Sequence, residues 1–127
     1  MAKWSDVKRL ALRLPSTSET TTYGWPAFAV AGKVFAWDRP LGRKDLAALG
    51  DAAPTGPVLA IRTADLEMKE ALLAWDRDVF FTIPHFDGYA AVLIQLNRVS
   101  RTALHEVLID GWLACAPSKL AAQYLNN

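Results

Sequence analysis

The sequence predicts an α+β fold in which an antiparallel β-sheet packs against helices. Short apolar segments that suit β-strands occur as two hairpin-like pairs and one separate run, and helical patterns lie before, between and after them. This order lacks the regular strand–helix alternation that indicates a parallel sheet. The chain has 127 residues, of which 52% are hydrophobic, and this is enough for one core. We therefore expect one domain over residues 1–127.

The first element expected is a helix over residues 5–14. Ser5 has a typical N-cap side chain, and apolar residues recur as far as Leu14 at the spacing of one buried stripe. Pro15 would end this helix. The Ser and Thr residues at 16–22 resist a helix and are interpreted as a loop.

A β-hairpin is expected next, after a turn at residues 23–26. Its strands would be residues 27–30 and 34–37, joined by a turn that contains Gly32. Alternation along the second strand would place Phe35 and Trp37 on one face of the sheet. The rings of this hairpin, interleaved with Lys33, are either core residues or a stacking surface for a nucleic-acid single strand.

Residues 38–57 are long for a plain connection and contain three prolines and three glycines. A short helix is expected at residues 43–49, ended by Gly50. Such an excursion suits either a contact surface or a cover for an edge strand.

The second half begins with residues 58–62, whose nearly continuous apolar run indicates a central strand. The helix after it would be capped by Thr63 and would bury Met68, Leu72 and Trp75 as one stripe. Residues 80–89 then suit a strand and a sharp turn that lead into a strand over 91–96.

The C-terminal part is expected to be helical. A long and largely covered helix starts near Ser100, with Leu104, Leu108 and Cys115 on its buried stripe. Pro117 would start a further short helix.

Several classes of protein are disfavoured by composition. Cys115 is the only cysteine, which excludes a disulfide within the chain and a cluster of thiolate metal ligands. A reducing, cytoplasmic setting is the simplest interpretation. No apolar run is long enough to cross a bilayer, so we expect no membrane association.

The sequence contains no recognisable catalytic signature. His85 could exchange protons near neutral pH and Asp87 could orient it, but no nucleophile motif, phosphate-binding glycine loop or set of metal ligands accompanies them. A turn histidine that bonds to the backbone is the simpler interpretation of His85. We therefore expect no enzyme activity, no cofactor and no metal ion.

The positive charge of the chain is concentrated in its first third. Residues 1–44 hold eight of the fourteen Lys and Arg residues but only three acidic residues. This asymmetry could form a basic face, although solvated helix surfaces often look the same. The candidate DNA contacts are Lys8, Arg9, Arg13, Lys33, Arg39, Arg43 and Lys44.

Segments along nearly the whole chain resemble the MmcQ/YjbR-like family. The most specific is Phe-Phe-Thr-Ile-Pro-His-Phe-Asp-Gly-Tyr at residues 80–89, and the others are residues 23–28, 32–33, 35–36, 69–73, 112 and 116–119. The resemblance implies a CyaY-like fold, similar to the double-wing domain of a phage transcription factor. It also implies DNA binding, but by analogy of fold alone, and it brings no catalytic residues.

Two functional hypotheses follow. The first is a non-enzymatic protein that binds DNA phosphates through the basic residues, with affinity that falls steeply as salt is added. The second is a domain that binds a small molecule or a protein, with a pocket at Trp25, His85, Asp87 and Tyr89.

Overall fold

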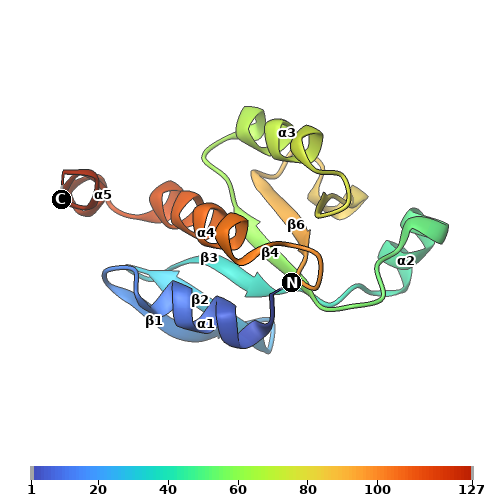
Figure 1. The fold of residues 1–127 in the computed structure, drawn as a ribbon, viewed down its shortest axis with the longest axis horizontal. Helices are drawn as coiled ribbons and strands as arrows, with labels where there is room; N and C mark the ends of the chain where they lie inside the picture. The colour runs from blue at the N-terminus through green and yellow to red at the C-terminus, as the bar shows by residue number, and fades with distance from the viewer. Residues whose placement is uncertain (1, 127) are drawn as a thin grey trace.

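A single sheet of six antiparallel strands organises the computed structural model, which describes residues 2–126 (Figure 1). The strand order is β1-β2-β3-β4-β6-β5. The predicted α+β class with an antiparallel sheet is therefore confirmed, and residues 1 and 127 of the expected domain lie outside the described part. The strands are β1 (Thr17–Thr22), β2 (Trp25–Val30), β3 (Lys33–Asp38), β4 (Val58–Arg62), β5 (Phe80–Phe81) and β6 (Ala91–Gln95).

Three helices, α1 (Trp4–Leu12), α3 (Leu66–Trp75) and α4 (Arg101–Cys115), cover one face of the sheet (Figure 1). Helix α5 (Ser118–Leu125) follows α4. The short helix α2 (Arg43–Leu49) and the 3-10 turn η1 (Gly50–Ala52) project away from this layer, and α2 contacts a second 3-10 turn, η2 (Pro84–Phe86). The expected helix at residues 43–49 is thus present.

The main core lies between the sheet and its helices. Trp112 of α4 and Phe28 of β2 are fully buried there, and the indole N–H of Trp112 donates a hydrogen bond to the carbonyl of Pro15 at 2.9 Å. A smaller cluster occupies the opposite face of the sheet, where Ala27, Trp37, Ala60 and Leu93 are aligned by the strand register. The open face of the sheet therefore also buries apolar surface.

Residues 17–22, expected as a loop, form strand β1. All of its side chains are polar and largely exposed, so hydrophobic alternation gives no signal for it. The strand exists because it pairs with β2 along its whole length, from Thr17 opposite Val30 to Thr22 opposite Trp25. Its threonines have high strand propensity, as β-branched residues do.

The buried side of α3 differs from the expected one. Met68 and Trp75 are exposed, and Lys69 is buried with Leu72. Lys69 faces the interior because its ammonium group donates hydrogen bonds to backbone carbonyls there. Asp65, and not Thr63, caps the helix by accepting from the backbone N–H of Met68 at 2.8 Å.

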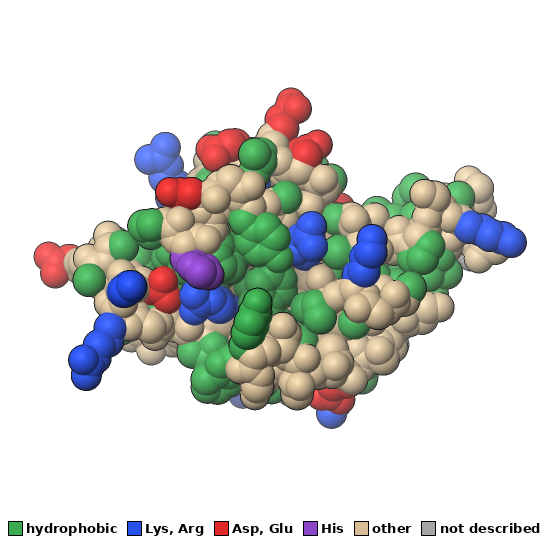
Figure 2. Space-filling model, turned by 180° about the vertical axis from the view of Figure 1, so that it is seen from behind, with side chains coloured by type: hydrophobic (Ala, Val, Ile, Leu, Met, Phe, Trp, Pro, Cys, Tyr) green, Lys and Arg blue, Asp and Glu red, His purple; other side chains and the backbone are tan. Residues whose placement is uncertain are grey.

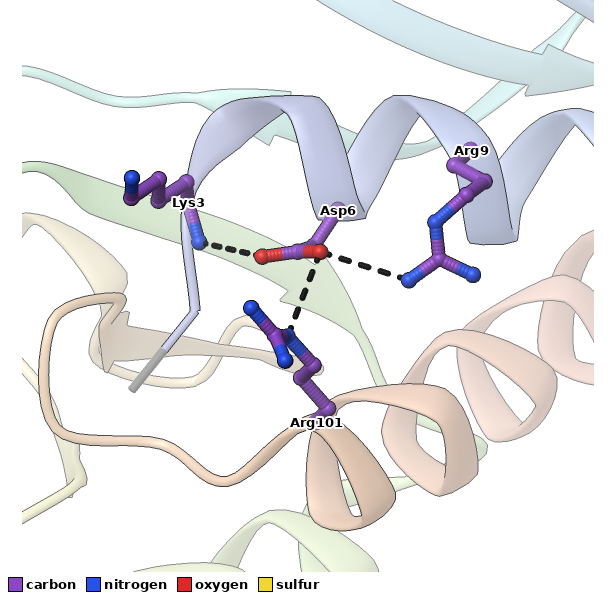
Figure 3. Close-up of polar contacts among 4 residues, drawn as sticks. All are labelled: Lys3, Asp6, Arg9 and Arg101. Carbon is purple, nitrogen blue, oxygen red and sulfur yellow. Dashed lines mark hydrogen bonds and ion pairs between the residues drawn. The ribbon is translucent and has the colours of Figure 1, made fainter.

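Helix α1 begins one residue before the expected Ser5, because Asp6 supports its first turn. The Asp6 carboxylate accepts a hydrogen bond from the backbone N–H of Lys3 at 2.9 Å. Arg9 lies 3.3 Å and Arg101 lies 3.4 Å from the other carboxylate oxygen (Figure 3). Since Arg101 is the first residue of α4, this carboxylate links the starts of two helices.

Helix α4 begins after Ser100, as expected, and lies close to the sheet at Gly111. A Cβ placed there would lie 2.8 Å from Cγ2 of Ile61 and 3.2 Å from the carbonyl oxygen of Arg62. Glycine at this position therefore sets the distance between the helix and strands β3 and β4.

Candidate functional site

A cavity of about 500 Å³ lies on the sheet face opposite the helices. Five aromatic side chains line it, from β2, β3, the η2 segment and the β1–β2 turn: Tyr23, Trp25, Trp37, Phe86 and Tyr89. Thr22, Asp38, Arg39, Pro40 and His85 complete the wall. Figure 2 shows this side of the molecule, with apolar side chains gathered in the middle and a histidine and basic side chains at their border. We call it the aromatic cavity.

A β-bulge brings Trp37 into the aromatic cavity. Phe28 pairs with Ala36 and Ala29 pairs with Val34, so that Phe35 has no partner across the strand pair. The extra residue places Phe35 in the main core and Trp37 on the opposite face, in contrast to the alternation expected from the sequence. Bulges re-aim side chains in this way and occur often beside functional sites.

The rim of the cavity is formed by a two-residue turn between β1 and β2. Tyr23 and Gly24 both have positive φ angles, of 51° and 81°, as the tight hairpin turn requires. Asn is the common residue at the first of these positions, yet here Tyr23 occupies it and is 95% exposed. A large ring is thus held in a strained backbone conformation beside Trp25.

The opposite wall is the segment of residues 84–89, which a buried lysine fixes in place. Lys69 Nζ donates to the carbonyl oxygens of Phe86 at 2.6 Å and Tyr89 at 2.9 Å. The rings of Phe86 and Tyr89 meet edge to face at 5.4 Å, and the guanidinium of Arg62 lies 5.3 Å from the Tyr89 ring centroid. This wall is therefore ordered without a ligand.

Burial lowers the pKa of Lys69, and the charges of Asp87 and Glu70 oppose that effect. Lys69 was not expected to be a functional residue, because a lysine within a helix is usually solvated. The signal that could have found it was its place in the family-like segment at residues 69–73.

His85 lies at the edge of the cavity and is exposed. Its ring centroid is 6.2 Å from that of Phe86, and within residues 2–126 its imidazole has no hydrogen-bond partner. Asp87 does not line the cavity and makes no hydrogen bond or ion pair with His85. The structure therefore brings together Trp25, His85 and Tyr89 of the predicted pocket, and leaves Asp87 outside.

Arg39 is the cation that lines the aromatic cavity. Its Nη1 atom donates to the carbonyl of Pro40 and lies 3.3 Å from the Asp45 carboxylate. The guanidinium carbon lies 5.8 Å from the centroid of the Phe86 ring. Nearby, desolvation raises the pKa of Asp38 above its ordinary value.

The seven predicted DNA contacts do not form one continuous patch. Lys8 and Arg9 lie on α1, which belongs to the helical layer, and they pair with Glu19 at 3.4 Å and Asp6 at 3.3 Å. Arg43 and Lys44 lie on α2, which projects from the body (Figure 1), whereas Arg39 directly follows β3 and lines the aromatic cavity. Arg13 is the C-cap residue of α1 and Lys33 is the first residue of β3; both are exposed, and neither forms an ion pair within the described chain.

The hairpin rings do not form a stacking surface for a nucleic-acid strand. Phe28 and Phe35 are fully buried in the main core, and only Trp25 is substantially exposed. Of the two interpretations of this hairpin, the core one applies to its phenylalanines.

Neither a metal cluster nor a bilayer-spanning helix is found in the part of the chain that the structure describes. No group of three or more His, Cys, Asp or Glu side chains there is arranged to hold a metal ion. Among the helices at residues 2–126, none has both the length and the apolar character that a bilayer span needs.

Comparison with known proteins identifies the family. A family model described as YjbR matches residues 12–114. The chain belongs to the YjbR family. This confirms the resemblance seen in the sequence, and residues 80–89, the most specific segment of that resemblance, contribute to one wall of the aromatic cavity.

Two curated relatives are similar to this YjbR protein over nearly their whole length. They are the uncharacterized protein Mb2600 of Mycobacterium bovis and the uncharacterized protein Rv2570 of Mycobacterium tuberculosis. Each is 40% identical to this chain over an alignment of 130 residues, and the alignment covers 100% of this chain and 98% of the relative. Among solved structures, protein DR2400 of Deinococcus radiodurans, with a domain described as DUF419, has a similar fold. Its TM-score is 0.66 at 19% identity, over 89% of this chain and 78% of that one.

Proposed function

We propose that this YjbR-family protein is a non-enzymatic binding protein whose ligand is a small molecule with a planar, unsaturated ring. The ring would enter the aromatic cavity between Trp25, Trp37 and Tyr89. The observation that carries this proposal is the convergence of five aromatic side chains on one cavity of about 500 Å³.

The size and the lining of the cavity support this assignment. Small-molecule sites commonly have volumes of about 300–1,000 Å³ and apolar walls with a few polar groups. Here Arg39, His85 and Asp38 are those polar groups. Stacking on aromatic rings favours flat ligands over saturated ones, since π-faces prefer offset or edge contacts with other rings.

The walls are also built in advance, which lowers the entropic cost of binding. The bulge at Phe35 fixes Trp37, which is buried, and Lys69 fixes the backbone of Phe86 and Tyr89. The rim residues Tyr23 and Trp25 are the most exposed of the five rings, and they need to be ordered by a ligand.

DNA is the weaker candidate for this protein. Its phosphates would need a continuous basic surface, whereas Lys8 and Arg9 are paired with carboxylates and lie in the helical layer, on the other side of the sheet from Arg39. We keep the reducing cytoplasm as the expected compartment, because Cys115 is a free thiol.

The test is a saturation-transfer NMR screen of uncharged heteroaromatic compounds, with saturated ring compounds of equal size as the negative set. We expect heteroaromatic compounds to bind and Trp25→Ala to weaken them by about 1–3 kcal/mol, the usual contribution of one stacked ring. Trp75→Ala is the matched control, because Trp75 is also exposed but lies on α3, outside the cavity. Equal binding of both sets, or equal loss in both variants, would contradict the proposal.

A further inference from the structure

A second cavity of about 460 Å³ adjoins the aromatic cavity. Arg39 and His85 line both, so these two side chains form the partition between them. The other walls of the second cavity come from the start of α2 and from Pro84. We call it the basic cavity.

The basic cavity has an excess of positive charge. Arg39, Arg43 and Lys44 line it, and Asp45 is its only carboxylate among the described residues. Asp45 is buried and already engaged, since it accepts from the backbone N–H of Gly42 at 2.9 Å and pairs with Arg39 at 3.3 Å. The charges of Arg43 and Lys44 are therefore not neutralised within residues 2–126.

Arg39 is held in a fixed position between the two cavities. Its Nη1 atom bonds to the carbonyl of Pro40 and to Asp45, and its planar guanidinium lies against the ring of Phe86. Nε and Nη2 make no hydrogen bond within residues 2–126, so this side of the guanidinium remains available. A guanidinium held in this way is suited to bind an oxyanion, because its donors match phosphate and carboxylate geometry.

From this arrangement we infer that the ligand joins a planar ring to an anionic group, a phosphate or a carboxylate. The ring lies in the aromatic cavity, and the anion lies across the partition in the basic cavity. Arg39 and an imidazole N–H of His85 donate to it, while Arg43 and Lys44 supply positive charge. The inference rests on the proposed function, since it adds a second group to the same ligand.

Matched pairs of ligands test the anionic group separately from the ring. The pairs are adenosine and adenosine monophosphate, riboflavin and its monophosphate, and indole and indole-3-acetate, with inorganic phosphate alone as a further probe. Affinities are measured by calorimetry or by NMR titration at two salt concentrations. In at least one pair, we expect the charged member to bind roughly tenfold or more tightly, as charge-assisted hydrogen bonds allow. Added salt should reduce that difference.

Two double variants with equal loss of charge locate the anion. Arg43→Ala/Lys44→Ala removes two exposed cations of the basic cavity, and Arg13→Ala/Lys33→Ala removes two exposed cations that line neither cavity. We expect the first to abolish the advantage of the charged ligands and the second to leave it nearly unchanged. Equal effects of the two would overturn the assignment of the basic cavity.

The remaining outcomes separate the two proposals. If both members of every pair bind equally well and Trp25→Ala weakens both, the proposed ring site is supported and the inference of an anionic group on the ligand is wrong. If no pair binds, or if inorganic phosphate alone binds as tightly as the best charged ligand, both proposals fail.

Discussion

The ammonium group of Lys69 lies 2.6 Å from the carbonyl oxygen of Phe86 and joins helix α3 to the wall of the aromatic cavity. The lysine is only 4% exposed, and its second acceptor is the carbonyl of Tyr89. No carboxylate within residues 2–126 lies close enough to form an ion pair with it. Its direct hydrogen-bond partners are therefore two backbone carbonyls, and these bonds hold residues 84–89 without using the cavity side chains.

Replacing Lys69 should loosen this wall. Lys69→Met keeps the buried apolar stem but removes the ammonium donor from both carbonyl groups, each of which keeps one backbone N–H donor. Because hydrogen bonds from a charged donor are lost, we expect a loss of about 1–3 kcal/mol in the free energy of unfolding. Urea unfolding measures this loss. Lys119→Met is the control, because Lys119 is exposed on α5 and makes no hydrogen bond or ion pair within the described chain. Equal midpoints for Lys69→Met and the wild type would contradict the role assigned to this contact.

The exposed and buried positions of α3 show why its interior face was predicted wrongly. Periodicity selected Met68, Leu72 and Trp75, since all three are apolar. The structure buries Leu72 as expected, but it buries Lys69 in place of Met68 and Trp75. The stem of Lys69 packs, and its ammonium group donates to two carbonyls that come from residues 17 and 20 positions away. Such a partner, distant in sequence, cannot be found from the local pattern.

The aromatic cavity was only partly predictable for a similar reason. Trp25, His85 and Tyr89 were named from chemical type and from the family-like segments, and the structure places them around one cavity. Trp37 and Arg39 were not expected there. Trp37 reaches the cavity through the bulge at Phe35, and hydrophobic alternation contains no information about a bulge. Most other elements were predicted because their burial patterns are regular.

Gly111 should not tolerate a larger side chain. Ala has higher helix propensity than Gly by about 1 kcal/mol, yet its Cβ would lie 2.8 Å from Ile61 and 3.2 Å from a carbonyl oxygen of Arg62. Overpacking costs about 1–3 kcal/mol, so we expect Gly111→Ala to unfold at a lower urea concentration. Gly42→Ala serves as the comparison, because the nearest atom to its Cβ is 3.7 Å away. A stability gain in Gly111→Ala would refute the close approach.

Asp6 should make the protein sensitive to acid. The hydrogen bond from the Lys3 backbone lowers the pKa of Asp6 below 3.8, with smaller help from Arg9 and Arg101, while desolvation acts in the opposite direction. The pKa of Asp6 is lower in the folded than in the unfolded protein. Its contribution to the free energy of unfolding is therefore complete above the unfolded pKa and is lost as pH falls through the folded pKa.

The measurement is the urea midpoint of wild type and Asp6→Asn between about pH 6 and pH 2. Asn can still accept the hydrogen bond from Lys3, so the variant is expected to fold and to show a flatter acid limb. Asp51→Asn, at an exposed position, should retain the wild-type slope. Identical slopes for wild type and Asp6→Asn would show that Asp6 does not couple folding to protons.

Cys115 should be chemically inert in the folded protein. Burial raises the pKa of its thiol, and the charges of Arg62 and Lys33 offset this only in part. Since the thiolate is the reactive form, we expect alkylation by iodoacetamide at pH 7.5 to be much slower in buffer than in urea. Equal rates in the two solutions would show that the α4 face carrying Cys115 is open to solvent.

A crystal structure of the protein soaked with the strongest heteroaromatic hit would show directly where the ring binds. We expect density for a flat ring between Trp25, Trp37 and Tyr89, with any anionic substituent directed past Arg39 toward Arg43 and Lys44. A ring bound at another surface, with the aromatic cavity occupied only by solvent, would contradict it.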